Sequence, residues 1–188
     1  MNLPNWITLS RLLLTVPFLV LLELPGMGWW ALGLFVFASA TDFVDGYLAR
    51  KLNLVTALGA LLDPLVDKVL VTGALVALAA KGAVPAWSVT LILFREFLVT
   101  GLRTLEASHG VVLSAGMLGK IKTVLQMIAI GFLLFALDPS GRGLTAGVFA
   151  TIGLAVYWLA VAMTFISGAQ YLWAGKHLLV APKERESL

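Results

Sequence analysis

The chain of 188 residues has no cysteine, only two histidines, and only 12% charged residues. The absence of cysteine excludes disulfide bonds and thiolate metal ligands. No serine–histidine or cysteine–histidine pair suggests a covalent nucleophile, and we expect His109 and His177 to lie in a loop and in the tail. Because the charge content is so low and 60% of the residues are hydrophobic, the composition predicts a membrane protein and not a soluble domain.

Long apolar runs recur along the whole chain, separated by segments rich in glycine and proline. A membrane-spanning helix needs about 20 mainly apolar residues, and an open sheet cannot satisfy its backbone groups in lipid. Small residues such as Gly73 and Ala74 would permit close helix packing. No internal repeat or long linker is apparent, so residues 1–188 are predicted to form one integral membrane domain, an all-α bundle of six transmembrane helices. The expected spans are 5–24, 29–50, 56–80, 86–107, 116–137 and 145–173.

The basic residues fall mainly on one side of this predicted bundle. With six spans both chain ends share a side, which carries eight lysines and arginines, whereas the other side carries Lys81 and Arg142. The positive-inside rule makes the first side cytoplasmic. The net charge of +3 therefore reflects topology and contact with anionic headgroups, not nucleic acid binding. The eight residues are Arg50, Lys51, Arg103, Lys120, Lys122, Lys176, Lys183 and Arg185.

Four of the five aspartates lie within one stretch of 26 residues. Carboxylates in membrane segments are costly, and they usually face a protein interior or a water-filled cavity where they serve a function. At helical spacing Asp42 and Asp45 share one face, and Asp63 and Asp67 share another. If the two helices fold antiparallel about the turn at 51–54, Asp45 faces Asp63 and Asp42 faces Asp67. The two layers would be about 5 Å apart.

Such a cluster would repel itself strongly without cations. Carboxylate oxygens suit Mg²⁺ or Mn²⁺, and a pair of ions about 4 Å apart is the usual arrangement for phosphoryl displacement. Gly46 and Gly59 leave space for a ligand, and Arg50 can bind a phosphate at the cytoplasmic mouth. Lys68 follows Asp67 directly and so points to a different face, where we interpret it as a structural counter-charge.

A single membrane aspartate is more often a structural partner of a basic residue, or part of an ion pathway, than a catalytic ligand. The full spacing is much more specific: Asp-x-x-Asp-Gly-x-x-Ala-Arg, eight residues, then Gly-x-x-x-Asp-x-x-x-Asp. It resembles the signature of the CDP-alcohol phosphotransferase family of integral membrane enzymes. Every signature position is met, at Asp42, Asp45, Gly46, Ala49, Arg50, Gly59, Asp63 and Asp67. Weaker local matches at 5–11, 95–103 and 119–123 are similar to the bacterial branch that makes phosphatidylglycerophosphate.

The resemblance implies transfer of the phosphatidyl group of CDP-diacylglycerol to an alcohol, with release of CMP. It implies a homodimer in the bacterial cytoplasmic membrane, with the active site at the cytoplasmic ends of the second and third helices. Two ions of Mg²⁺ or Mn²⁺ are expected, and Asp67 would also act as the general base on the acceptor hydroxyl. The expected metal ligands are Asp42, Asp45, Asp63 and Asp67. The residues expected to bind CDP-diacylglycerol are Asn5, Thr8, Gly46, Arg50, Thr56 and Gly59.

We expect the acceptor to be sn-glycerol 3-phosphate, whose phosphate needs cations beyond those that hold the CDP moiety. The fourth and fifth spans offer Arg95, Arg103, Lys120 and Lys122. Arg95 is the leading candidate, because a buried guanidinium needs an anionic partner. The alternative partner for Arg95 is Glu96 or another acid, and the other three residues could equally serve membrane orientation alone.

Two further readings of the sequence stay open. Within the same family, the acceptor could be inositol phosphate or phosphatidylglycerol. From another class, a cation-coupled transporter could use the acidic cluster as its ion site. Against transport stand the clustering of the acids near one membrane face and the absence of an obvious inverted repeat.

Overall fold

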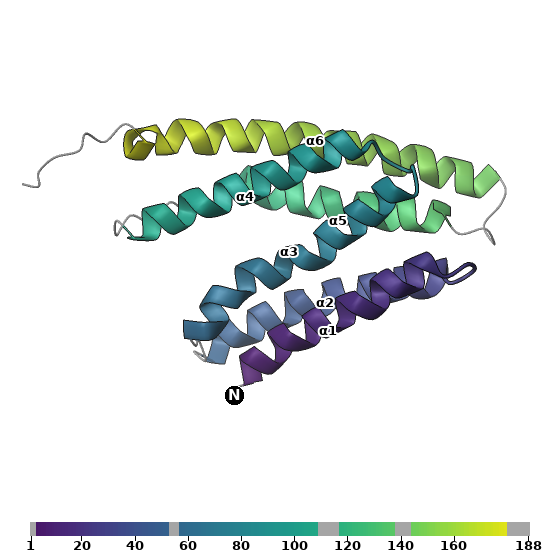
Figure 1. Ribbon diagram of the computed structural model, residues 1–188, viewed down its shortest axis with the longest axis horizontal. Helices are drawn as coiled ribbons and strands as arrows, with labels where there is room; N and C mark the ends of the chain where they lie inside the picture. The colour runs from purple at the N-terminus through teal and green to yellow at the C-terminus, as the bar shows by residue number, and fades with distance from the viewer. Residues whose placement is uncertain (1–2, 53–56, 109–116, 138–143, 180–188) are drawn as a thin grey trace, which may run out of the picture.

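The computed structural model describes the backbone of residues 3–52, 57–108, 117–137 and 144–179, and the side chains of residues 12–41, 68–104, 117–137 and 145–173. Within these ranges the chain is all-α, as predicted, and it forms six helices (Figure 1). The helices are α1 (Leu3–Glu23), α2 (Gly28–Leu52), α3 (Ala57–Ala80), α4 (Ala86–Ser108), α5 (Met117–Leu137) and α6 (Leu144–Leu179). Their bounds agree closely with the predicted spans, except that α6 continues past the expected end at residue 173.

Helix α3 runs obliquely through the middle of the molecule (Figure 1). On one side of it α1 packs against both α2 and α3, and on the other side α3 contacts α4 and α5. Helices α5 and α6 form the most extensive pair, and α4 also packs on α6. Because α3 touches both groups of helices, it connects the carboxylate-bearing part of the chain with the basic residues of α4 and α5.

Small residues bring α1 and α3 close together, as the sequence predicts. A Cβ atom at Gly73 would lie only 3.2 Å from Leu19 Cδ2, and the side chain of Ala74 is completely buried. Small residues are the usual means of close helix approach in membrane proteins, where no hydrophobic force drives helices together. The contact therefore fixes α3 against α1 at the level of Gly73.

The turn after α3 sets the start of α4. Gly82 has a φ of 72°, a left-handed conformation that favours glycine. The Ala83 N–H donates to the Leu78 carbonyl at 2.9 Å, and the Gly82 N–H donates to the Ala79 carbonyl at 3.0 Å. These two bonds form a Schellman motif, which ends α3, and Pro85 directly precedes α4. The short connection makes α4 run back along α3.

The outer surface of the bundle is strongly apolar. A core that includes Phe18, Leu78 and Ile130 is fully buried between the helices. Large apolar side chains also cover the outside, where Trp30 is 70% and Phe94 is 65% exposed. A soluble monomer rarely exposes so much apolar surface, whereas lipid tails accommodate it. This surface is consistent with a helical membrane protein.

Two helical segments are long and apolar enough to cross a bilayer, among the residues whose side chains are described. They are Met117–Leu137 and Thr145–Trp173. Three shorter apolar segments accompany them, Leu12–Glu23, Gly28–Thr41 and Lys68–Ala80. The architecture thus agrees with a membrane protein in its coarse features, and the crossing of all six helices stays a prediction.

Candidate functional site

The predicted metal ligands lie on two helices that are joined by a short connection. Asp42 and Asp45 belong to α2, and Asp63 and Asp67 belong to α3. Because both segments are helical, each pair shares one face of its helix, and the end of α2 lies at the same end of the molecule as the start of α3 (Figure 1). The carboxylates themselves are outside the described side chains. As a donor set, four carboxylates fit Mg²⁺ or Mn²⁺, which prefer oxygen ligands.

The residues predicted to bind CDP-diacylglycerol are placed only by their backbone. Asn5 and Thr8 lie in α1, Gly46 and Arg50 in α2, and Gly59 in α3, whereas Thr56 lies outside the described residues. Among the side chains that are described, no group of three or more histidine, cysteine, aspartate or glutamate residues is placed to hold a metal ion. The CDP and metal assignments therefore stay predictions.

A cavity of about 450 Å³ lies between α3, α4 and α5, with Ala38 and Ser39 of α2 also in its wall. All four residues predicted to bind the acceptor phosphate line this one cavity, although they come from two helices and are up to 27 positions apart in sequence. Its described lining contains five basic side chains and a single carboxylate, that of Glu96. The basic side chains are Lys68, Arg95, Arg103, Lys120 and Lys122.

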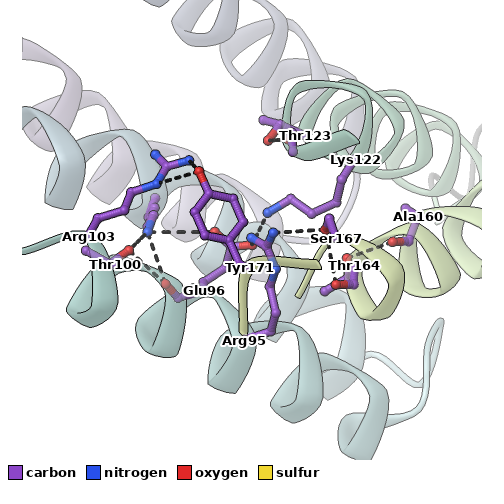
Figure 2. A network of polar contacts seen from close by, with 12 residues as sticks. Arg95, Glu96, Thr100, Arg103, Lys122, Thr123, Ala160, Thr164, Ser167 and Tyr171 are labelled. Carbon is purple, nitrogen blue, oxygen red and sulfur yellow. Dashed lines mark hydrogen bonds and ion pairs between the residues drawn. The ribbon is translucent and has the colours of Figure 1, made fainter. Parts of the chain in front are cut away.

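Glu96 lies at the centre of a polar network (Figure 2). Its Oε1 atom accepts hydrogen bonds from the Lys122 ammonium and, at 3.2 Å, from Arg95 Nη1. Its Oε2 atom lies 3.7 Å from the Lys68 ammonium. Lys68 also donates to the Glu96 backbone carbonyl at 3.3 Å and to the Thr100 hydroxyl. Contacts to one glutamate thus connect α3, α4 and α5.

Arg95 is held from two sides. The alternative raised by the sequence, a pair with Glu96, is present, and Arg95 Nη2 also donates to Ser167 Oγ at 2.9 Å. Gly168 of α6 leaves space for the aliphatic part of the Arg95 side chain, because it has no Cβ atom. A Cβ atom at this position would lie only 3.0 Å from Arg95 Cγ. The Arg95 side chain is only 11% exposed. The pair with Glu96 does not remove Arg95 from the cavity, whose wall includes both residues.

Arg103 is oriented by a second residue of α6. Its Nε atom donates to the Tyr171 hydroxyl at 3.1 Å, and its Nη2 atom donates to the same oxygen. The guanidinium carbon lies 5.0 Å from the centre of the tyrosine ring, within the range of a cation–π contact. Figure 2 shows Arg95 and Arg103 approached by residues of the same helix, Ser167 and Tyr171. Sequence reasoning missed this contribution of α6.

Lys68 has a larger part in the cavity than the sequence suggests. Its pair with Glu96 agrees with the interpretation as a structural counter-charge. Sequence reasoning did not anticipate that Lys68 also lines the cavity, beside the basic residues of α4 and α5. Because Lys68 follows Asp67 directly, one residue of the cavity wall is adjacent in sequence to the predicted general base.

The cavity wall also contains polar groups that lack a partner. Among the described side chains, three buried polar atoms make no hydrogen bond: Ser39 Oγ, Arg95 Nε and Gln126 Nε2. All three residues line the cavity. An unsatisfied buried polar group costs about 1–3 kcal/mol, so a cluster of them favours a site that binds a polar ligand.

The charge of the cavity indicates which ligand it can hold. Five positive charges stand against one negative charge in the described lining, and Lys122 is almost fully buried, at 3% exposed. A partly enclosed site with such an excess favours an anion with several acceptor oxygens. Arginine can bind a phosphate through two parallel hydrogen bonds, and lysine acts on it as a point charge. The arrangement is therefore suited to a phosphate group.

Comparison with known proteins identifies the class of protein that this site serves. Residues 1–166 match the model of the CDP-alcohol phosphatidyltransferase family, and the chain belongs to this family. The resemblance seen in the aspartate signature is thereby confirmed.

Three curated relatives carry one and the same name, CDP-diacylglycerol–glycerol-3-phosphate 3-phosphatidyltransferase. The Bacillus subtilis protein is 45% identical over 185 residues, covering 90% of this chain and 93% of the relative. The Rickettsia typhi protein is 40% identical, covering 93% of this chain and 97% of the relative. The Cereibacter sphaeroides protein is 36% identical, covering 90% of this chain and 93% of the relative.

Proposed function

We propose that this protein transfers the phosphatidyl group of CDP-diacylglycerol to sn-glycerol 3-phosphate, giving phosphatidylglycerophosphate and CMP. The observation that carries the choice of a phosphate-bearing acceptor is the cavity, whose described lining holds five cations and one carboxylate. The names of the bacterial relatives support the same acceptor. Phosphatidylglycerol, an alternative acceptor, has a phosphodiester with a single negative charge and would balance less of the excess positive charge than a phosphomonoester.

The phosphate of the acceptor would bind within the cavity. Arg95 would donate through its guanidinium, held at a fixed angle by Ser167, and Lys122 would contribute charge from its buried position. Arg103, whose side chain Tyr171 orients, and the exposed Lys120 would complete the contacts to phosphate. Arginine at two of these positions favours an oxyanion with several acceptor oxygens, such as a phosphate, over a halide.

The other substrate would bind on α1, α2 and the first half of α3. We expect the CDP moiety to contact Asn5, Thr8, Gly46, Arg50, Thr56 and Gly59. Asp42, Asp45, Asp63 and Asp67 would hold two divalent cations, Mg²⁺ or Mn²⁺. When bound, such ions neutralise the charge that develops on phosphate oxygens during displacement. The acyl chains of the substrate would stay in the cytoplasmic leaflet.

The reaction itself then needs positioning and a proton acceptor. The acceptor hydroxyl oxygen forms a bond to the β-phosphorus of CDP-diacylglycerol as the bond from that phosphorus to CMP breaks, and Asp67 takes the hydroxyl proton. Lys68, the next residue of α3, lies in the cavity wall. An acceptor whose phosphate is bound in the cavity would lie close to this part of α3, and a fixed orientation of its hydroxyl would favour the transfer.

The same proposal includes the setting of the enzyme. All six helices would cross the bacterial cytoplasmic membrane, with both termini and the active site on the cytoplasmic side. Eight of the ten basic residues counted for orientation would then lie on that side. The protein would act as a homodimer among membrane lipids.

The decisive experiment uses the purified protein in detergent with CDP-diacylglycerol and Mg²⁺, and measures CMP release with a panel of acceptors. We expect CMP release with sn-glycerol 3-phosphate and none with inositol phosphate or phosphatidylglycerol. Turnover with inositol phosphate but not with glycerol 3-phosphate would overturn the acceptor assignment. Absence of CMP release with every acceptor would overturn the enzymatic function.

A further inference from the structure

Glu96 stands out because it is the one carboxylate in the described lining of a strongly basic cavity. It contacts a cation from each of three helices, Lys68 of α3, Arg95 of α4 and Lys122 of α5. Its Oε1 atom accepts hydrogen bonds from Arg95 and Lys122, and its Oε2 atom pairs with the Lys68 ammonium. The relative position of these three cations therefore depends on a single side chain.

Lys122 depends on this carboxylate most strongly. Its side chain is 3% exposed, so water cannot replace a lost partner, and its ammonium donates to Glu96. A buried ammonium without a counter-charge is strongly unfavourable. Lys68, Arg95 and Lys122 would also repel one another if the negative charge between them were removed. Glu96 thus allows the cations to lie close together before a phosphate binds.

Glu96 does not exhaust the hydrogen-bonding capacity of these cations. A lysine ammonium has three donors and a guanidinium has five. Arg95 gives one donor to Glu96 and one to Ser167, and its buried Nε atom has no partner within the described residues. A phosphate can therefore bind beside the carboxylate, with no need to displace it.

We propose that Glu96 is a positioning residue for the acceptor: its carboxylate holds Lys68, Arg95 and Lys122 in the arrangement that binds the acceptor phosphate. The inference rests on the proposed function, since it concerns the same cavity. The opposite role is that of a competitor, in which Glu96 occupies the cations and must be displaced by phosphate. The two roles predict opposite signs, because removal of the negative charge would weaken acceptor binding in the first case and strengthen it in the second.

The test is Glu96→Gln, which keeps the size of the side chain and removes its charge. CMP release is measured with purified protein while glycerol 3-phosphate and CDP-diacylglycerol are varied in turn. We expect the KM for glycerol 3-phosphate to rise about tenfold or more, as for the loss of one charge-assisted hydrogen bond, and the KM for CDP-diacylglycerol to stay unchanged. An unchanged or lowered KM for glycerol 3-phosphate would overturn the proposal, as would an equal rise for both substrates.

The matched control is Glu23→Gln, which removes the acid of another lysine pair, Glu23 with Lys81 at 3.9 Å, outside the cavity. It should leave both KM values unchanged. If Glu96→Gln does not fold, Glu96→Asp keeps the charge but withdraws it by one methylene, and the same selective rise in KM is expected; its absence would contradict the proposal. Wild-type protein without CMP release on glycerol 3-phosphate would contradict the proposed function instead, so the two failures are distinguishable.

Discussion

Replacement of Gly168 by alanine would disturb the acceptor site without altering any residue that lines the cavity. The new Cβ atom would lie 3.0 Å from Arg95 Cγ, 3.6 Å from Nε and 3.9 Å from Cδ. Carbon atoms in contact are separated by about 3.5–4.0 Å, so the arginine stem would have to move by about 0.5–1 Å. Arg95 Nη2 donates to Ser167 Oγ at 2.9 Å, and a shift of this size would stretch or break that hydrogen bond.

The magnitude follows from the interactions of Arg95. A hydrogen bond that involves a charged group contributes about 1.5–3 kcal/mol, and about 1.4 kcal/mol corresponds to a tenfold change in affinity. Because a flexible side chain can adapt in part, we expect the lower end of this range, a rise of about tenfold in the KM for glycerol 3-phosphate. The KM for CDP-diacylglycerol should not change, since its proposed contacts lie on α1, α2 and α3.

The assay is CMP release at saturating CDP-diacylglycerol with glycerol 3-phosphate varied, after thermal unfolding in detergent has established that the variant folds. Gly147→Ala provides the matched control on α6, because among the described residues no atom beyond the neighbouring backbone of its own helix lies within 4 Å of the position of its Cβ. It should leave the KM for glycerol 3-phosphate unchanged. A folded Gly168→Ala variant with wild-type KM would refute the role of Arg95 in acceptor binding.

Three further predictions concern other parts of the mechanism. Asp67→Asn should abolish CMP release while the protein stays folded, and near-normal rates would remove Asp67 from the role of general base. Chelation of divalent cations with EDTA should stop CMP release, and Mg²⁺ or Mn²⁺ should restore it; activity that persists in EDTA would contradict the assignment of the four carboxylates. Tyr171→Phe removes the hydroxyl that accepts from Arg103 but keeps the ring. Because Arg103 is exposed and water can replace this partner, we expect the KM for glycerol 3-phosphate to rise only a few-fold, about two- to fivefold, and an unchanged KM would separate Tyr171 from acceptor binding.

The helices could be predicted from sequence because their signals are local. Long apolar runs interrupted by glycine and proline give nearly the same bounds as the structure, and Gly82 ends α3 where the break between Lys81 and Pro85 lies. The end of α6 is the exception. The expectation stopped at residue 173, where the apolar run gives way to more polar sequence, yet the helix continues to Leu179. The hydrophobicity of a segment predicts where the chain can leave the lipid, whereas the end of the helix depends on its backbone hydrogen bonds.

The basic residues of the cavity could be nominated from sequence, but their partners could not. Arg95 and Lys122 are conspicuous because charge in an apolar helix requires a partner. The contacts of Ser167 and Tyr171 depend on the packing of α6 against α4, which no spacing within one helix reveals. A polar pair four residues apart on a largely apolar helix was the available signal. The contacts of Lys68 could likewise not be predicted from sequence, since its partners Glu96 and Thr100 are 28 and 32 residues away.

Recognition of the acceptor phosphate by the basic residues of the cavity is tested best by a comparison of glycerol 3-phosphate with glycerol. Both offer the same attacking hydroxyl, and only the first offers a phosphate to Arg95 and Lys122. We expect CMP release with glycerol 3-phosphate and little or none with glycerol at equal concentration, and an Arg95→Ala variant should lose most of this preference. Equal rates with the two acceptors in the wild-type protein would show that the cavity does not recognise the phosphate.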